Sequence, residues 1–257
     1  MTTATTIHAR DFTPADVATV LEQEAAIFPL SAPLPSRTVQ AWTSGACAPF
    51  SRIFTTPDQN GNGDLVVGNL LCIPIPERAW HQLLAGKLVE GDLVGADRVW
   101  DGGRASGDRI GIHVYHIEVT DRLAWKRAGD GVVGRAAREV GLAVDKVRKE
   151  VCPELEVVGF SALAVSEGGI RTMFNYYNMR EFPYYPVSSD YVVTDPKTGK
   201  VTAMETIDTQ ERMNEVITAN DGRVPLRIKM ACVLPEWPSV LWKYTQARPS
   251  STRKAQL

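Results

Sequence analysis

The spacing of apolar side chains divides the chain into segments with helical and with strand-like periods. Between residues 17 and 25 apolar positions recur every three or four residues, which predicts a helix. Thr13 can cap this helix, and Pro14 and Asp16 suit its first turn. Pro29 then ends it. Further helices are predicted at residues 36–43, 77–84, 129–151, 167–177 and 209–218, and strands at residues 6–9, 51–55, 65–73, 109–119, 155–163, 184–194 and 224–234.

The order of these elements indicates the fold class. Hairpins dominate the first half, where two strands flank a turn-rich connection at 57–64, whereas helices alternate with strands in the second half. This order predicts a mixed α+β fold within the broad α/β class, and not a doubly wound parallel sheet. We expect one domain at residues 1–247, with insertions at about 76–108 and 195–222 and a polar tail at 248–257.

Charge and composition argue against several classes of protein. The 257 residues carry 28 Lys and Arg against 30 Asp and Glu, and a net charge of −2 does not suit a nucleic-acid binder. No apolar run reaches the roughly 18 residues that span a bilayer, so we expect no membrane partner. The first ten residues lack the apolar core of a secretion signal. The four cysteines form no C-x-x-C pair, so buried free thiols and a reducing, cytoplasmic compartment are expected.

A glycine-rich motif in the middle of the chain is a candidate phosphate site. Gly129, Gly131 and Gly134 form a literal G-x-G-x-x-G. A dinucleotide site needs a strand directly before the first glycine, and the predicted strand ends near Val119. A dinucleotide site, a ligand-free helix start and another kind of phosphate site all stay open. The last is favoured because amides at a helix start bind anions and basic residues 126–127 precede the motif.

Residues 58–64 match the first half of a calcium-binding loop. The twelfth position of such a loop should be a bidentate Glu, whereas this chain has Asn69, and strands rather than helices flank the segment. We therefore predict a hairpin turn without calcium, and we expect no other metal site.

The predicted strand at 109–119 contains two histidines. Side chains alternate along a strand, so His113 and His116 would lie on opposite faces and could not clamp one metal. A lone strand histidine is ordinarily a core residue. The face of His113 would also carry Tyr115, Ile117 and Val119, and the face of His116 would carry Glu118.

Two further motifs lie in an order found in a known family. After the predicted strand the chain has Lys126-x-x-Gly129-x-Gly131, and later it has Tyr177 five residues before Phe182. This order resembles the GNAT family of N-acetyltransferases. The phosphate motif of that family reads Q/R-x-x-G-x-G/A, and its last helix ends Y-x-x-x-G-F.

The resemblance is more specific around the strand with the two histidines. Residues 113–119 are similar to the H-x-H-x-x-x-V strand of arylalkylamine N-acetyltransferases, and the proline-containing loop at 28–35 is similar to the loop that covers the acceptor in that subgroup. The chain departs from the pattern at three positions. Lys126 replaces Gln or Arg, Glu181 replaces Gly, and Tyr115 stands where the subgroup has its second histidine.

The resemblance implies a central mixed, mostly antiparallel sheet with flanking helices. It also implies transfer of an acetyl group from acetyl-CoA, the co-substrate, to a primary amine of a small molecule. The implied general base is His113, and the implied general acid is Tyr177. The implied acceptor-binding residues are Phe28, Leu34 and Tyr115. The implied coenzyme A contacts are Ile117, Val119, Lys126, Arg127, Ala128, Gly129, Asp130, Gly131 and Val132.

The chemistry of acetyl transfer fits these residue types. A histidine can accept the ammonium proton near neutral pH, a strand N–H such as that of Val119 can stabilise the oxyanion, and a tyrosine can protonate the departing thiolate. The pantetheine arm could hydrogen-bond along the strand edge where the strand at 155–163 diverges. Two alternatives remain: a GNAT-like module that binds acyl-CoA without catalysis, and a nicotinamide-dependent oxidoreductase using residues 129–134.

Overall fold

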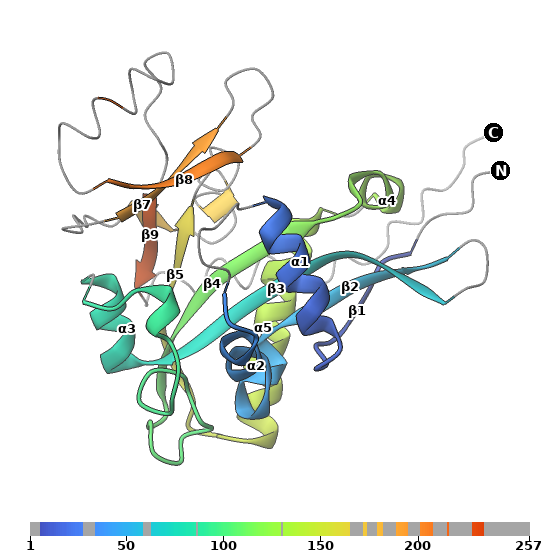
Figure 1. Ribbon diagram of the computed structural model, residues 1–257. Coiled ribbons are helices and arrows are strands. Elements are labelled where there is room, and N and C mark those ends of the chain that lie inside the picture. The colour runs from blue at the N-terminus through green and yellow to red at the C-terminus, as the bar shows by residue number, and fades with distance from the viewer. Residues whose placement is uncertain are drawn as a thin grey trace.

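The computed structural model describes residues 6–27, 34–58, 63–85, 87–129, 131–164, 172–173, 179–181, 189–194, 201–207, 215 and 228–233. Within these residues one sheet has the strand order β1 (His8–Asp11), β2 (Arg52–Pro57), β3 (Asp64–Pro76), β4 (Arg109–Val119), β5 (Glu156–Ala164), β9 (Ile228–Val233) and β6 (Arg180–Glu181) (Figure 1). A second sheet pairs β7 (Ser189–Thr194) with β8 (Val201–Ile207).

Neighbouring strands of the main sheet are antiparallel except for β4 and β5, which run parallel. The predicted hairpin is present as β2 and β3, and the amide of Asp58 donates to the carbonyl of Gly63 (2.8 Å) across its connection. The predicted fold class, a mixed and mostly antiparallel sheet with flanking helices, is therefore confirmed.

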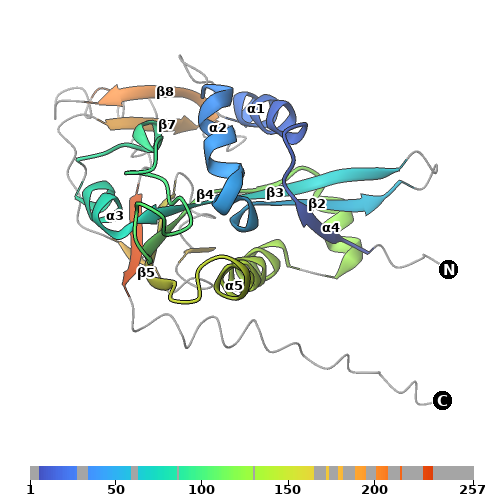
Figure 2. The ribbon, with the colours of Figure 1, turned by 90° about the horizontal axis from the view of Figure 1, so that it is seen from below.

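Helices cover both faces of the main sheet (Figure 2). One face is covered by α5 (Val132–Glu150), and the other by α1 (Asp16–Ile27), α2 (Ser36–Thr43) and α3 (Glu77–Leu84). The elements α2, α3 and β4 have the bounds predicted from the sequence. Shorter helical segments are η1 (Gly45–Phe50), η2 (Glu90–Asp92) and α4 (Arg122–Ala128).

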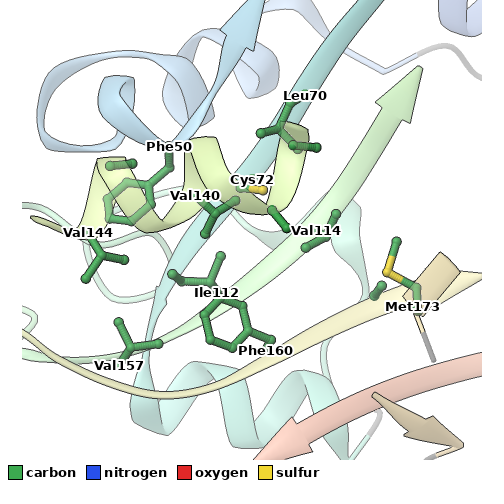
Figure 3. Close-up of a cluster of buried hydrophobic side chains, with 14 of the residues drawn as sticks. Phe50, Leu70, Cys72, Ile112, Val114, Val140, Val144, Val157, Phe160 and Met173 are labelled. Atoms are coloured by element: carbon green, nitrogen blue, oxygen red, sulfur yellow. The ribbon is translucent and has the colours of Figure 1, made fainter. Parts of the chain in front are cut away.

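The apolar core on the α5 face explains why α5 forms and where it sits. Val140, Val144 and Val147 recur at helical spacing and are buried against the sheet. Figure 3 shows Val140 and Val144 over Ile112 of β4 and Phe160 of β5. Burying each such side chain stabilises the fold by roughly 1.5–3 kcal/mol, so this contact fixes α5 across β4 and β5. We call the buried apolar residues on this face the α5 cluster, which also includes Leu70, Cys72, Val114 and Val157.

The start of α1 differs from the prediction by a few residues. Thr13 and Pro14 form a turn before the helix, which begins at Asp16. The carboxylate of Asp16 reaches back to accept bonds from the amide and hydroxyl of Thr13, and it pairs with Arg10 (2.6 Å). The carboxylate of Asp16, and not the hydroxyl of Thr13, is thus the acceptor at this helix start.

The glycine motif does not start the long helix as predicted. Residues 122–128 form a separate helix, α4, capped by the carboxylate of Asp121. Gly129 ends α4 in the left-handed conformation (φ 65°), which glycine adopts without strain. Gly131 then precedes α5, which begins at Val132. The prediction was wrong here because α4 is short and its basic residues were assigned to a phosphate loop.

The later part of the chain agrees with the prediction in part. β7 and β9 lie within the two predicted late strands, but β8 occupies a stretch for which no strand was predicted. The predicted helices at 167–177 and 209–218 lie mostly outside the described residues. Cys47 and Cys72 are buried free thiols, as expected, and Cys152 is half-buried and free.

Candidate functional site

The strand β4 separates from β5 halfway along its length (Figure 1). The two strands pair from Arg109 with Glu156 to Val114 with Ala162, whereas β4 continues to Val119. β3 accompanies the opposite edge of β4 over this whole length. Within the described residues, the β5-side edge of β4 therefore has no strand partner beyond Val114, which leaves backbone groups able to pair with an extended ligand.

A bulge in β4 lies where the two strands separate. Cys72 of β3 pairs with Val114 of β4, but the adjacent Leu71 pairs with His116. Tyr115 is therefore the extra residue in β4. The bulge shifts the alternation of every later side chain by one position. As a result Ile117 and Val119 pack against the α5 cluster, as Val114 does.

The prediction that alternation separates His113 from His116 and Glu118 is therefore wrong. Because of the bulge, His116 and Glu118 lie on the same face as His113, whereas simple alternation would put them on the opposite face. Glu118 accepts a hydrogen bond from the side chain of Asn69 (2.8 Å), whose amide also donates to Gln23 of α1 (3.1 Å). We call the face covered by α1, α2 and α3 the α1 face. It carries His113, Tyr115, His116 and Glu118.

His113 is held by hydrogen bonds at both ring nitrogens. Its Nε2 lies 2.7 Å from Oε1 of Glu90, and its Nδ1 lies 2.9 Å from Oγ of Ser161 in β5. The Ser161 oxygen also accepts a bond from the indole N–H of Trp80 (2.9 Å). His113, Ser161 and Trp80 are buried, whereas the side chain of Glu90 is 22% exposed.

The donors and acceptors in this chain of bonds fix its direction. An indole N–H only donates, and an ionised carboxylate only accepts. Every group has a partner when the Ser161 hydroxyl donates to Nδ1 and the Nε2–H donates to Glu90. His113 thus orients Glu90, and Glu90 is the most exposed member of this chain of bonds.

Trp80 and Glu90 both come from the segment predicted as an insertion at 76–108. Trp80 of α3 packs directly over Gly111 of β4, where an added Cβ would lie 2.1 Å from the indole ring. The absence of a side chain at Gly111 therefore allows the indole to pack close enough to β4 to donate to Ser161. The segment 76–108 thus supplies both ends of the chain of bonds around His113.

Tyr115 connects β4 to the two helices above it. Its hydroxyl donates a short hydrogen bond to Oε1 of Glu24 in α1, and its ring packs on Trp42 of α2 with centroids 4.8 Å apart. Burial raises the pKa of Glu24 against the opposing effect of the Tyr115 bond, and the charges of Glu90 and Glu118 raise it further. Carboxyl groups whose pKa is shifted by burial and by neighbouring charges are common at functional sites.

Burial also sets the charges of the neighbouring groups. It lowers the pKa of His116 to about 4 against the pull of Glu90, so His116 is neutral at neutral pH. It raises the pKa of Glu118 against the hydrogen bond from Asn69. This face therefore presents carboxyl groups together with the neutral imidazole of His116.

Along the chain, α4 joins the end of β4 to the first turn of α5. Gly131 precedes it without a side-chain cap, and the turn contains no acidic residue. Lys126 and Arg127 are exposed in the last turn of α4. The unbonded amides of a helix start, with basic side chains nearby, suit an anion.

The structure divides the predicted site residues by position. Leu34 and Tyr115 pack with the apolar residues under α1, α2 and α3, and Gly129 is exposed. The residues that pack with the α5 cluster are Ile117, Val119, Ala128 and Val132. The residues outside the described part of the chain are Phe28, Asp130 and Tyr177.

Sequence reasoning missed Glu24, Glu90 and Ser161. Glu24 had a local signal, because it is an acidic residue at an apolar position of the predicted helix 17–25. Glu90 and Ser161 had none, because they reach His113 from 23 and 48 positions away in the chain.

Comparison with known proteins returns structures of acetyltransferases. No protein-family model and no curated protein matches the chain by sequence. A mosquito arylalkylamine N-acetyltransferase-like protein has 12% identity over 89% of this chain and 100% of its own, with a TM-score of 0.42. The Drosophila melanogaster polyamine N-acetyltransferase has 11% identity over 89% and 100%, also with a TM-score of 0.42. A GNAT superfamily phosphinothricin acetyltransferase from Sinorhizobium meliloti, in complex with acetyl-CoA, has 11% identity over 92% of both chains, with a TM-score of 0.40.

These solved structures have identities of 11–12% with this chain and TM-scores of 0.40–0.42. At such low identities and TM-scores, the activity has to be argued from the chain's own residues. Within the described residues, no helix is long and apolar enough to cross a membrane. The same residues contain no group of three or more His, Cys, Asp or Glu side chains placed to hold a metal ion.

Proposed function

We propose that the protein is an N-acetyltransferase that moves an acetyl group from acetyl-CoA to a primary amine of a small molecule. The observation that supports this most is the separation of β4 from β5 at Tyr115. It puts a strand edge that has no partner in the described part of the chain beside the carboxyl and imidazole groups of the α1 face. Such a site can bind an extended thioester on one side and a cationic amine on the other.

The chain has groups that fit coenzyme A. The amide-like pantetheine arm would hydrogen-bond along residues 115–119 of β4, with Ile117 and Val119 contributing backbone groups. The pyrophosphate would reach the amides at the start of α5, from Gly131 onward, because the amide of Gly129 already donates to the carbonyl of Lys126 (3.2 Å). Lys126 and Arg127 would add positive charge. When bound, acetyl-CoA supplies the activated acetyl group.

In the proposed reaction the ammonium of the acceptor loses one proton to the pair formed by His113 and Glu90. Glu90 is the exposed member of the pair, and the Nε2–H of His113 holds its carboxylate in place. The freed amine attacks the thioester carbonyl, and the C–S bond breaks as the amide bond forms. A backbone N–H such as that of Val119 would stabilise the oxyanion. Tyr177 would protonate the departing thiolate, and the second proton that the nitrogen loses as the amide forms would restore the Tyr177 hydroxyl.

The nicotinamide alternative has little support. A dinucleotide motif needs its first glycine directly after a strand, but here Gly129 ends the helix α4.

Phe28, Leu34 and Tyr115 are proposed to contact the acceptor. Leu34 and Tyr115 pack against the same apolar residues beneath α1 and α2.

The test is a thiol-release assay with acetyl-CoA and a panel of primary amines, combined with melting scans. CoA and acetyl-CoA should stabilise the protein, by about 2.7 kcal/mol at a hundredfold excess over the dissociation constant. NAD and NADP should not. Stabilisation by acetyl-CoA without thiol release from any amine would favour the non-catalytic binding module. A melting shift with NAD alone would overturn the proposal.

A further inference from the structure

Two carboxyl groups on the α1 face lack, among the described residues, the cation that a buried carboxylate normally has. Glu24 is 5% exposed and Glu118 is 7% exposed. Across the described residues, none of the ion pairs made by Lys or Arg involves either of them. Burying a carboxylate without a counter-charge is costly, so the pair points to a positive group supplied from outside.

The hydrogen bonds around these carboxyl groups are also incomplete. Oε1 of Glu24 accepts from Tyr115, but the buried Oε2 has no partner among the described residues. The side-chain nitrogen of Asn69 donates to Gln23 and Glu118, but its buried Oδ1 likewise has no described partner. Both atoms are acceptors, so the missing group is a donor.

These groups form one cluster. Asn69 bonds directly to Glu118 and to Gln23, which precedes Glu24 on α1. The carboxyl group of Glu24 is close enough to Glu90 and Glu118 to feel the charge of both. Glu90 already has His113 as its partner and, in the proposed reaction, serves the amine that is acetylated. Glu24 and Glu118 are acidic groups beyond what one ammonium requires.

We propose that Glu24, Glu118 and Asn69 form a subsite for a second ammonium group, so that the acceptor is a diamine or a longer polyamine. This inference rests on the proposed function. The second ammonium donates to Oε2 of Glu24 and to Oδ1 of Asn69 and compensates the charge of Glu118. The other amine of the same molecule faces Glu90 and is acetylated.

The first measurement is equilibrium binding to the protein saturated with CoA, which permits no turnover. The probes are 1,4-diaminobutane and 1-aminobutane, which have the same carbon chain and differ by one amine. Since a hydrogen bond to a charged group contributes about 1.5–3 kcal/mol, the diamine should bind roughly 10- to 100-fold more tightly. Equal binding of the two probes, or binding of neither, overturns the subsite.

The second measurement uses the isosteric variants Glu24→Gln and Glu118→Gln. Each should weaken diamine binding by about tenfold or more and leave binding of 1-aminobutane nearly unchanged. Glu22→Gln removes the same charge from an exposed position of the same helix and serves as the matched control. A loss of affinity for both probes, or an equal loss in Glu22→Gln, contradicts the subsite.

The two proposals fail in different ways. A diamine that binds tightly but releases no thiol from acetyl-CoA supports the subsite and contradicts the proposed transferase. Acetylation of 1-aminobutane with the same kcat/KM as the diamine supports the transferase and contradicts the subsite.

Discussion

The Nε2 atom of His113 lies 2.7 Å from a carboxylate oxygen of Glu90, a residue 23 positions earlier in an irregular segment. The histidine is buried in the sheet, whereas the carboxylate is partly exposed. This arrangement determines which of the two groups a substrate can reach. His113 does not present a nitrogen to solvent itself, and a substrate would instead meet the Glu90 carboxylate that the Nε2–H of His113 holds in place.

Glu90→Gln should therefore lower turnover by roughly 10²–10⁴-fold, the usual effect of losing a positioned acid or base. The amide oxygen of the variant can still accept the bond from His113, so the melting temperature should change little. Steady-state thiol release over a range of pH values measures the effect. Asp97→Asn, an exposed acid in the same segment, is the control and should behave as the unaltered protein.

His113→Ala should lower turnover most at neutral pH. Partial recovery is expected at high pH, where more of the free amine is already deprotonated. Because the side chain is buried, a urea titration must accompany the assay. A pH profile that keeps its shape, with lower stability alone, would indicate a purely structural histidine.

Tyr177→Phe should lower turnover, again by roughly 10²–10⁴-fold, because only the proposed acid is removed. The ring is retained, so the melting temperature should stay close to that of the unaltered protein. Thiol release and a melting scan measure the two quantities. Near-native turnover across the pH range would exclude Tyr177 as the acid.

Gly111→Ala should destabilise the fold by about 1–3 kcal/mol or more, because overpacking displaces neighbouring groups. The added Cβ would lie 2.1 Å from the indole of Trp80, and that indole holds Ser161. Urea unfolding measures the loss. Gly91→Ala, where a Cβ would meet nothing within 4 Å, is the matched control. A native-like Gly111→Ala variant would show that Trp80 can move away from β4.

His116 should make the protein less stable as the pH falls. Burial lowers its pKa to about 4 from the ordinary value of 6.5, so between these values the unfolded chain binds more protons than the native protein. The free energy of unfolding then falls as the pH drops through this window. His116→Asn should flatten that slope in urea titrations at pH 4.5, 5.5 and 7. An unchanged slope would mean that His116 is more solvated than its burial suggests.

The elements that the sequence predicts best are those with a strong period and clear ends. β4 and α3 lie where their patterns predict them. α4 was missed because a helix of seven residues offers too few positions for a period to stand out. β8 was missed because it lies in the stretch at 195–222 that was interpreted as an insertion, and it pairs with β7 in a second sheet whose partner strand the sequence does not reveal.

The candidate site was harder to predict than the sheet. The motif placed His113 correctly on a long strand, but its partners Glu90 and Ser161 meet it only through tertiary packing. The bulge at Tyr115 could not be read from the sequence, because one extra residue leaves the alternation on either side intact.

The bulge has a consequence for sequence alignment. A β4 strand of the same length without the extra residue would carry His116 and Glu118 on the α5 face. An ungapped alignment of β4 with such a strand equates residues from opposite faces of the sheet. The residue types of the two strands do not reveal this mismatch. Residues 109–114 and 116–119 therefore have to be aligned as two independent blocks, with Tyr115 as a single-residue gap between them.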